Sequence, residues 1–368
     1  MTTVLPEAHR VRALRAVGFR NLARVELAPG PRLNVIAGDN GQGKSNLLEA
    51  IHYAATLRSF RGAGTDELVA TGSEQAHVAL VSEAAPLPRT LEVGLRRGQA
   101  RSPKLDGKRP RSGLAWLGVL PAVLFHPGDL ALAQGGPEGR RTLLDEVLSE
   151  IDPTYATTLA SYVKALRSRN RLLKDEPVNV RAVTAFDGVL AASGAILGEA
   201  RARLVADLAP RATEVWHELF ETTVPLEIAF APRVEPSEKA LLAALAESLP
   251  KDLARGFTAE GPHADDVVLR VKEKSAKHHA SQGQQRALVL ALKVAELDVL
   301  SQRTGRVPLL LLDDVSSELD ATRNRRFFGL LARMGGQVFL TTTDPRLIQL
   351  EEARTDHRVV AGRLERVG

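Results

Sequence analysis

The sequence predicts an α/β protein in which one lobe is assembled from both ends of the chain and an α-helical second lobe is inserted between them. Near the N-terminus, an apolar strand, a glycine-rich loop and a helical pattern follow one another. From about residue 139 to 249, apolar residues recur at the three- and four-residue spacing of helices. After Gly261, strands and helices alternate again. We therefore expect segments 1–120 and 256–368 to form the first lobe, and segment 121–255 the second.

The N-terminal elements follow from local patterns. Val11–Phe19 and Arg24–Leu27 are plausible strands, and Arg32–Ala37 is apolar and β-branched, as a buried strand should be. The loop Gly38–Gly43 leads into a helical pattern from Ser45 to about Leu57. This order of strand, glycine-rich loop and helix is the context that a phosphate-binding loop requires.

The rest of the chain is divided by prolines and by changes of period. His77–Lys104 alternates and contains Pro and Gly, which indicates hairpins at a sheet edge. We expect the helical stretch to be cut into moderate helices at Pro153, Pro177, Pro210 and Pro225. The elements expected after it are a strand at Val267–Val271, a helix at Gly283–Leu300 and strands at Val307–Leu312 and Gln337–Thr342.

Composition excludes several classes of function. The 368 residues contain no cysteine, which rules out disulfides, thiolate catalysis and thiol zinc sites. No apolar run approaches the roughly 20 residues that span a bilayer, and Met1–Arg10 lacks the apolar core of a signal peptide. We therefore expect a cytoplasmic protein without a membrane partner. No cluster of His and carboxylates has the spacing of a nuclease metal site.

The net charge of +5 permits an anionic partner without proving one. Basic residues are concentrated between Arg89 and Arg111, where only Glu92 and Asp106 oppose them. Such a run would attract phosphate, but a solvated hairpin rim is the alternative explanation. The basic residues are Arg89, Arg96, Arg97, Arg101, Lys104, Lys108, Arg109 and Arg111.

Residues 38–45 fit the complete phosphate-loop pattern G-x-x-x-x-G-K-[ST]. Glycines allow backbone N–H groups to turn around phosphate oxygens, and the following helix N-terminus adds positive potential. Lys44 would lie between the β- and γ-phosphates of ATP, and the Ser45 hydroxyl would ligate Mg²⁺. The alternative is a chance glycine-rich turn. The nucleotide-binding candidates here are Gly38, Asn40, Gly41, Gln42, Gly43, Lys44, Ser45 and Asn46.

A second acidic motif follows the apolar run Leu309–Leu312. A buried parallel strand delivers its last residues to the sheet edge that also carries the phosphate loop. Asp313 is then placed to hold Mg²⁺, and Asp314 to orient the attacking water. With Lys44, these two acids are the expected catalytic residues. Two acids at a strand end could also simply form a turn.

Ser281-Gln282-Gly283-Gln284 precedes a long helix and resembles the signature motif of ABC-type ATPases. A serine hydroxyl and a glycine N–H at a helix N-terminus form an anion site, although an ordinary polar helix cap is the alternative. The resemblance implies that this site closes over the γ-phosphate held by a second subunit. Two subunits would thus enclose two ATP molecules in a two-fold symmetric homodimer.

Two further segments match the ABC-type pattern. Ser317-Glu318-Leu319-Asp320 stands at the usual place of the D-loop, and Thr341–Asp344 ends the next strand. Most ABC-type proteins have a histidine at the position of Thr343. A hydroxyl can donate to the γ-phosphate but cannot carry charge, so Thr343 is a nucleotide-binding candidate that departs from the pattern.

The phosphate-loop region, Gly38 to Ile51, resembles the DNA-repair ATPases related to SMC proteins, and further motifs narrow the resemblance to the RecF family. They occur in the order of that family and span nearly the whole chain. Where RecF proteins commonly have arginine, this sequence has Ala264. The motifs are Arg58–Arg61, Phe125–Leu130, Arg140-Arg141, Gly261–His263, Asp265-Asp266 and Asp313–Asp320.

The resemblance implies a recombination mediator with ATP and Mg²⁺ as cofactors. Proteins of this family dimerise on ATP, bind DNA near gaps or single-strand/double-strand junctions, and act with RecR and RecO. Slow ATP hydrolysis would then serve as a switch. Three alternatives stay open: an ATP-binding subunit of a membrane transporter, an SMC-like clamp, and a scaffold that binds ATP without turnover.

Overall fold

The computed structural model describes residues 7–83, 87–220, 222–315, 320–348 and 354–367. The chain forms two compact units. The first unit consists of the segments up to Asp129, Glu218–Phe220 and from Glu296 onward; the second consists of Leu130–His217 and Glu221–Ala295. Segment 256–295 therefore lies in the second unit, not with the chain ends as expected. Strand pairing explains this, because the strand at 266–271 pairs with a strand of the inserted segment.

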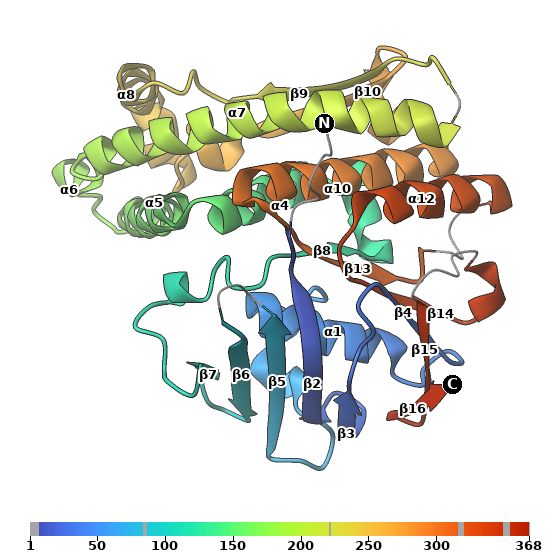
Figure 1. Ribbon diagram of the computed structural model, residues 1–368. Helices are drawn as coiled ribbons and strands as arrows, with labels where there is room; N and C mark the ends of the chain where they lie inside the picture. Colours follow the sequence, from blue (N-terminus) through green and yellow to red (C-terminus); the bar gives the residue numbers. More distant parts are fainter. Residues whose placement is uncertain (1–6, 84–86, 221, 316–319, 349–353, 368) are drawn as a thin grey trace. The chain divides into compact units, whose positions relative to one another are not determined.

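The first unit contains a six-stranded sheet (Figure 1). Five of its strands are mutually parallel, and β16 is antiparallel to its neighbour. The parallel strands near its centre are almost entirely buried, which explains their continuous apolar sequences. In spatial order the strands are β16 (Arg363–Val367), β15 (Arg354–Val360), β4 (Leu33–Ala37), β14 (Val338–Thr342), β13 (Leu309–Asp313) and β8 (Ala122–Phe125).

A five-stranded antiparallel sheet belongs to the same unit. The hairpins expected between residues 77 and 104 are present as β5, β6 and β7. A short parallel pair joins β1 (Glu7–Ala8) to β12 (Arg306–Val307). The spatial order of the five strands is β3 (Leu22–Leu27), β2 (Arg10–Phe19), β5 (Gln75–Glu83), β6 (Arg89–Arg96) and β7 (Ser102–Leu105).

Helix α1 (Lys44–Thr56) joins the two sheets through one hydrophobic cluster. The cluster includes Leu47 and Ile51 of α1, Leu80 of the antiparallel sheet and Phe339 of the parallel sheet. Trp116 seals the end of α1, because its indole N–H lies 3.1 and 3.0 Å from the carbonyl oxygens of residues 54 and 55. The helix that carries the phosphate-loop lysine is therefore fixed by apolar contacts along most of its length. The other helices of this unit are α2 (Thr65–Leu68), α12 (Ala321–Met334) and the 3₁₀ turns η1 (Gly113–Ala115), η2 (Pro127–Leu130) and η4 (Pro345–Leu347).

The second unit is mostly helical, with a small antiparallel sheet of β9 (Leu226–Ala231), β10 (Asp266–Val271) and β11 (Lys274–Ser275). The expected break at Pro210 is wrong, since α7 runs through it. Strand β9 lies inside the stretch that we expected to be helical. The helices are α3 (Ala131–Gln134), α4 (Pro137–Ile151), α5 (Pro153–Leu172), α6 (Val180–Thr184), α7 (Asp187–Phe220), α8 (Glu238–Arg255), η3 (Pro262–Ala264), α9 (Ala276–His279) and α10 (Gln282–Thr304), which crosses into the first unit.

Ion pairs hold the helices of the second unit together. Arg169 of α5 is fully buried and bonds Asp187, Asp252 and Thr258 at 2.7–2.9 Å. A buried charge is stable only where partners surround it, so this arginine ties α5 to α7 and to α8. Arg201 of α7 is held in the same way, and its partners are Asp145, Asp265 and the Pro262 carbonyl.

One helical segment among the described residues, Val180–Phe220, is long and apolar enough to cross a membrane by length and composition. An 18-residue window in it has a mean hydropathy of 1.5, so the expectation of no such run was wrong. The segment is this apolar because buried core positions recur along the whole of α7. Leu190, Leu197, Leu204 and Trp216 are buried, and Arg201 lies in the same helix, which are features of a core helix.

Replacing Arg169 by methionine should strongly destabilise the second unit. The change leaves Asp252 buried without its cation, and we expect the free energy of unfolding to fall by about 3–5 kcal/mol. Urea unfolding followed by far-UV circular dichroism measures the change. The control is Arg203→Met. Arg203 is exposed, and its ion pair to Glu199 is long at 4.0 Å and contributes less than about 1 kcal/mol. Equal effects of the two changes would contradict this account of the Arg169 network.

Candidate nucleotide-binding site

Three functional segments follow three neighbouring strands of the parallel sheet. The phosphate loop comes after β4, the threonine run ends β14, and the acid pair ends β13. Because β14 lies between β4 and β13 and all three are parallel, their carboxyl ends share one sheet edge. The topology therefore brings together residues that lie about 270 to 300 positions apart in the sequence. The phosphate loop and the acid pair lie at the same sheet edge, as expected.

The phosphate loop needs its glycines. Gly38, Gly41 and Gly43 have φ values of 157°, 79° and 116°, which side chains rarely tolerate. A Cβ on Gly38 would lie 2.5 Å from the Val359 carbonyl oxygen, and one on Gly43 would lie 2.7 Å from Oδ1 of Asn21. The loop is thus enclosed by neighbouring segments, while its tip at Asn40 and Gly41 is exposed.

The loop is also held from the C-terminal strands. The backbone N–H groups of Ala361 and Gly362, in the turn between β15 and β16, donate to the side chain and carbonyl of Gln42 at 2.6 and 2.9 Å. Gln42 was expected to bind nucleotide, and in the structure its amide oxygen serves this turn. Two hydrogen bonds from the turn between β15 and β16 therefore restrain the loop at Gln42, and no phosphate-loop pattern identifies the residues that donate them.

Lys44, the first residue of α1, is buried and folds back over the loop. Its Nζ donates to the carbonyl oxygens of Gly38 and Asp39 at 2.7 and 2.9 Å. Burial lowers the pKa of Lys44, while Asp314, Asp313 and Asp39 act in the opposite direction. The structure therefore places Lys44 within electrostatic reach of the acid pair. Ser45 and Asn46 follow in the first turn and are half-buried.

The two acids differ in environment. Asp313 is buried, and its Oδ1 accepts a 2.7 Å hydrogen bond from the Thr341 hydroxyl. The same hydroxyl accepts from the backbone N–H of Asp314 at 3.0 Å, so Thr341 fixes both acids. Asp314 has a φ of 54°, which turns the chain sharply at the strand end. Thr341 is a site residue whose role the sequence analysis did not identify.

Thr343, expected at the γ-phosphate, is exposed directly after β14. Of the expected D-loop, Ser317, Glu318 and Leu319 lie outside the described residues. Asp320 caps α12, because its carboxylate accepts from the Arg323 backbone N–H at 2.9 Å.

The signature-like residues belong to the second unit, at the start of α10. Ser281 is exposed, and its hydroxyl accepts from the Gln284 backbone N–H at 3.2 Å. In return the Gln284 side chain accepts from the Ser281 N–H at 2.9 Å, which completes a capping box. Gln282 and Gly283 begin the helix between them. The helix-cap interpretation is therefore correct for the chain by itself, and the cap presents its hydroxyl at an exposed helix N-terminus.

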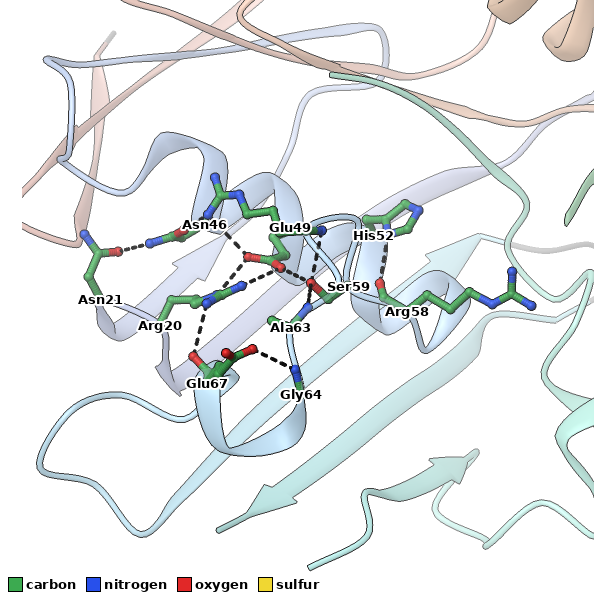
Figure 2. A network of polar contacts seen from close by, with 11 residues as sticks. Arg20, Asn21, Asn46, Glu49, His52, Arg58, Ser59, Ala63, Gly64 and Glu67 are labelled. Atoms are coloured by element: carbon green, nitrogen blue, oxygen red, sulfur yellow. Dashed lines mark hydrogen bonds and ion pairs between the residues drawn. The ribbon is translucent and has the colours of Figure 1, made fainter. Parts of the chain in front are cut away.

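A polar network lies behind the phosphate loop, around the buried carboxylate of Glu49 (Figure 2). Its members come from the turn after β2, from α1 and from the segment after α1, including Arg20, Asn21, Asn46 and Ser59. A cavity of about 1080 Å³ adjoins it. The residues that line both the cavity and the network are Arg20, Asn21, Asn46, Arg61 and Glu67.

The basic run splits into anchored and exposed residues. Arg97 donates to backbone carbonyls of residues 66, 69, 70 and 73, and Arg89 pairs with Asp106. Arg101 donates to the Leu57 carbonyl. These three arginines therefore shape the antiparallel sheet, whereas the exposed cations of the run are Arg96, Lys104, Lys108, Arg109 and Arg111. In the part of the chain that the structure describes, no group of three or more His or acidic side chains could hold a metal by itself.

Comparison with known proteins agrees with this arrangement. A family described as an AAA domain matches residues 13–84. The chain is 45% identical to the DNA replication and repair protein RecF of Anaeromyxobacter sp. (strain Fw109-5), covering 92% of this chain and 93% of that protein. It is 41% identical to RecF of Myxococcus xanthus (strain DK1622), with 92% of each covered.

Solved structures give the same result. A structure of "the recombination mediator protein RecF-ATPrS in RecFOR pathway" has a TM-score of 0.90 and 31% identity, covering 99% of this chain and 100% of that one. An Smc head domain of Pyrococcus furiosus shares the fold alone, with a TM-score of 0.58 and 14% identity. The match to RecF extends through both units, since it covers 99% of this chain. The chain therefore belongs to the RecF family of DNA replication and repair proteins.

Proposed function

We propose that the protein is an ATP-dependent recombination mediator that dimerises on ATP and hydrolyses it slowly to reopen. The observation that carries the proposal is the meeting of the phosphate loop and the acid pair at one sheet edge, with Lys44 buried within reach of Asp313 and Asp314. The RecF structures named with ATP and with ATPrS support the choice of nucleotide.

The proposed roles follow from the chemistry of each group. Lys44 contacts the β- and γ-phosphates, and its present carbonyl partners are exchanged for phosphate oxygens. Ser45 and Asp313 would hold Mg²⁺, since hard oxygens are its preferred ligands. Asp314 orients the attacking water. The nucleoside would extend toward the cavity beside Asn21 and Asn46.

Dimerisation would use the exposed Ser281 cap of a second copy. A γ-phosphate held by Lys44 of one subunit would be completed by the hydroxyl and N–H groups at the N-terminus of the partner's α10. Each subunit supplies both halves, so the pairing is two-fold and closed. Hydrolysis removes the bridging charge and so releases the dimer.

The proposed partners are DNA, RecR and RecO. DNA would lie across the dimer, bound through its phosphates and largely independent of sequence, at gaps or single-strand/double-strand junctions. One of the similar solved structures is described as RecF in the RecFOR pathway, which supports partners of this kind.

Lys44→Met should lower ATP affinity by about 100-fold or more, because it removes a charge-assisted contact to the phosphates. Titration with a fluorescent ATP analogue and Mg²⁺ measures the affinity. Lys104→Met, in the exposed edge strand β7, is the matched control and should bind like wild type. Unchanged affinity in Lys44→Met would place the nucleotide elsewhere.

Ser281→Arg should leave ATP binding by the monomer intact and prevent ATP-dependent dimerisation, because the bulky cation replaces the hydroxyl at the shared phosphate. Sedimentation velocity at saturating Mg·ATP reports the dimer. Ser237→Arg is the control, since Ser237 also caps a helix of the second unit, with its hydroxyl 3.2 Å from the Ala240 N–H. Persistent pairing of Ser281→Arg would refute the two-subunit site.

Asp314→Asn should slow phosphate release by about 100-fold while ATP binding and dimerisation persist, because an amide cannot accept a proton from the attacking water. A continuous phosphate-release assay measures the rate. Asp106→Asn, at an exposed turn of the antiparallel sheet, should hydrolyse ATP like wild type. No detectable turnover in the wild-type protein, with or without DNA, would favour a scaffold that binds ATP without hydrolysis.

A further inference from the structure

Glu49 of α1 is an acid with no place in the proposed chemistry, yet its side chain is fully buried. Arg20 binds it through two parallel hydrogen bonds, with Nε and Nη2 each 3.0 Å from a carboxylate oxygen. The Ser59 hydroxyl donates to it at 2.5 Å, and Nη1 of Arg61 lies 3.5 Å from Oε2. Four contacts from three side chains fix the position of this carboxylate closely.

The network continues from Arg61 to the phosphate loop. Nη1 of Arg61 donates to Oδ1 of Asn46 at 2.7 Å. Nδ2 of Asn46 donates to Oδ1 of Asn21 at 2.8 Å, and Nδ2 of Asn21 donates to the Gly41 carbonyl at 3.3 Å. Figure 2 shows Asn21, Asn46 and Glu49 in this succession.

The direction of these bonds is set consistently from both ends, because the Gly41 carbonyl can only accept and requires the Asn21 nitrogen to face it. An arginine can only donate, so Arg61 requires the oxygen of the Asn46 amide to face it. The Asn46 nitrogen must then point away, toward the Asn21 oxygen, and the Asn21 nitrogen toward the loop carbonyl. Glu49 thus orients two amides through a single cation.

This chain of hydrogen bonds ends at the phosphate loop, where the orientation of the peptide groups decides whether phosphate can bind. Asn21 touches the loop at two places, since it bonds the carbonyl of Gly41 and a Cβ on Gly43 would lie 2.7 Å from its Oδ1. Because Asn21 binds the Gly41 carbonyl, it restrains the orientation of that peptide, and the N–H groups of such a loop are the groups that bind phosphate. A buried acid–arginine cluster contributes little to the stability of the fold, because desolvation offsets most of the attraction between the charges.

We propose that Glu49 is a positioning residue that holds the phosphate loop in its phosphate-binding form through Arg61, Asn46 and Asn21. The inference rests on the proposed function, since it assigns these residues to the same nucleotide site. The relay acts on the loop before nucleotide arrives, so it contributes equally to the bound ground state and to the transition state. Its loss should therefore raise KM and Kd while kcat at saturating ATP stays nearly constant.

The test compares Glu49→Gln, Asn46→Ala and the double variant. Glu49→Gln keeps the shape of the side chain and removes its charge. Asn46→Ala cuts the relay beyond the buried cluster and so avoids its cost to folding. Each single change should weaken ATP binding by about tenfold. Because both break the same relay, the double variant should lose little more than either single one.

The control is Glu260→Gln. Glu260 belongs to the second unit, and Arg233 binds its carboxylate through two hydrogen bonds of 2.9 and 2.8 Å, as Arg20 binds Glu49. It should bind ATP like wild type. Thermal unfolding of all variants separates a loss of fold from a loss of positioning.

A second readout needs no nucleotide. Backbone amide exchange of residues 38–46, measured without nucleotide, should be faster in Glu49→Gln and in Asn46→Ala, and unchanged in Glu260→Gln. Unchanged exchange, or a double variant whose Kd change is the product of the two single changes, would overturn the relay. If the wild-type protein fails to bind ATP while exchange still responds as expected, the proposed function fails and the relay stands. If ATP binds equally to all variants, the relay fails and the proposed function stands.

Discussion

The site depends on one constraint, which is that three buried parallel strands end at the same edge of one sheet. Strands β4, β14 and β13 bury every residue except Ala37, and the apolar side chains on one of their faces enter the cluster that also contains α1. A one-residue slip of register would turn those side chains away from α1. The relative position of Lys44, Thr341 and the acid pair is therefore determined by burial of apolar surface, and the polar groups add precision to it.

Much of the first unit could be predicted because local sequence and final environment agree there. A fully buried parallel strand needs a continuous apolar run, and β13 has one in Leu309–Leu312. The phosphate loop is equally local, since the positive φ angles of the loop itself require glycine at those positions. Pro210 and β9 were missed for the opposite reason. Helix α7 is packed well enough along its length to tolerate a proline, and β9 exists only because β10, 40 residues later, pairs with it.

The residues around the loop could not be predicted because their partners are distant in sequence. Gln42 fits a motif position, but its side chain accepts from the Ala361 N–H and its backbone carbonyl accepts from the Gly362 N–H, more than 300 positions away. Asn21 follows β2 and resembles any polar turn residue until the fold places it against Gly41 and Gly43. The Ser281 cap is different, because its partner Gln284 lies only three positions away and a helix cap was among the alternatives that the sequence offered. Only the exposure of Ser281 depends on the fold.

The charge of Lys44 is only partly compensated by groups of the chain itself. Lys44 is buried against two carbonyls, and its desolvation is offset in part by Asp314 and Asp313. A triphosphate would give the ammonium stronger acceptors, but it would also bring negative charge toward the two acids. That repulsion requires a cation between them, which Mg²⁺ on Ser45 and Asp313 would supply. Binding of nucleotide and of metal should therefore be coupled, each raising the affinity for the other by the same factor.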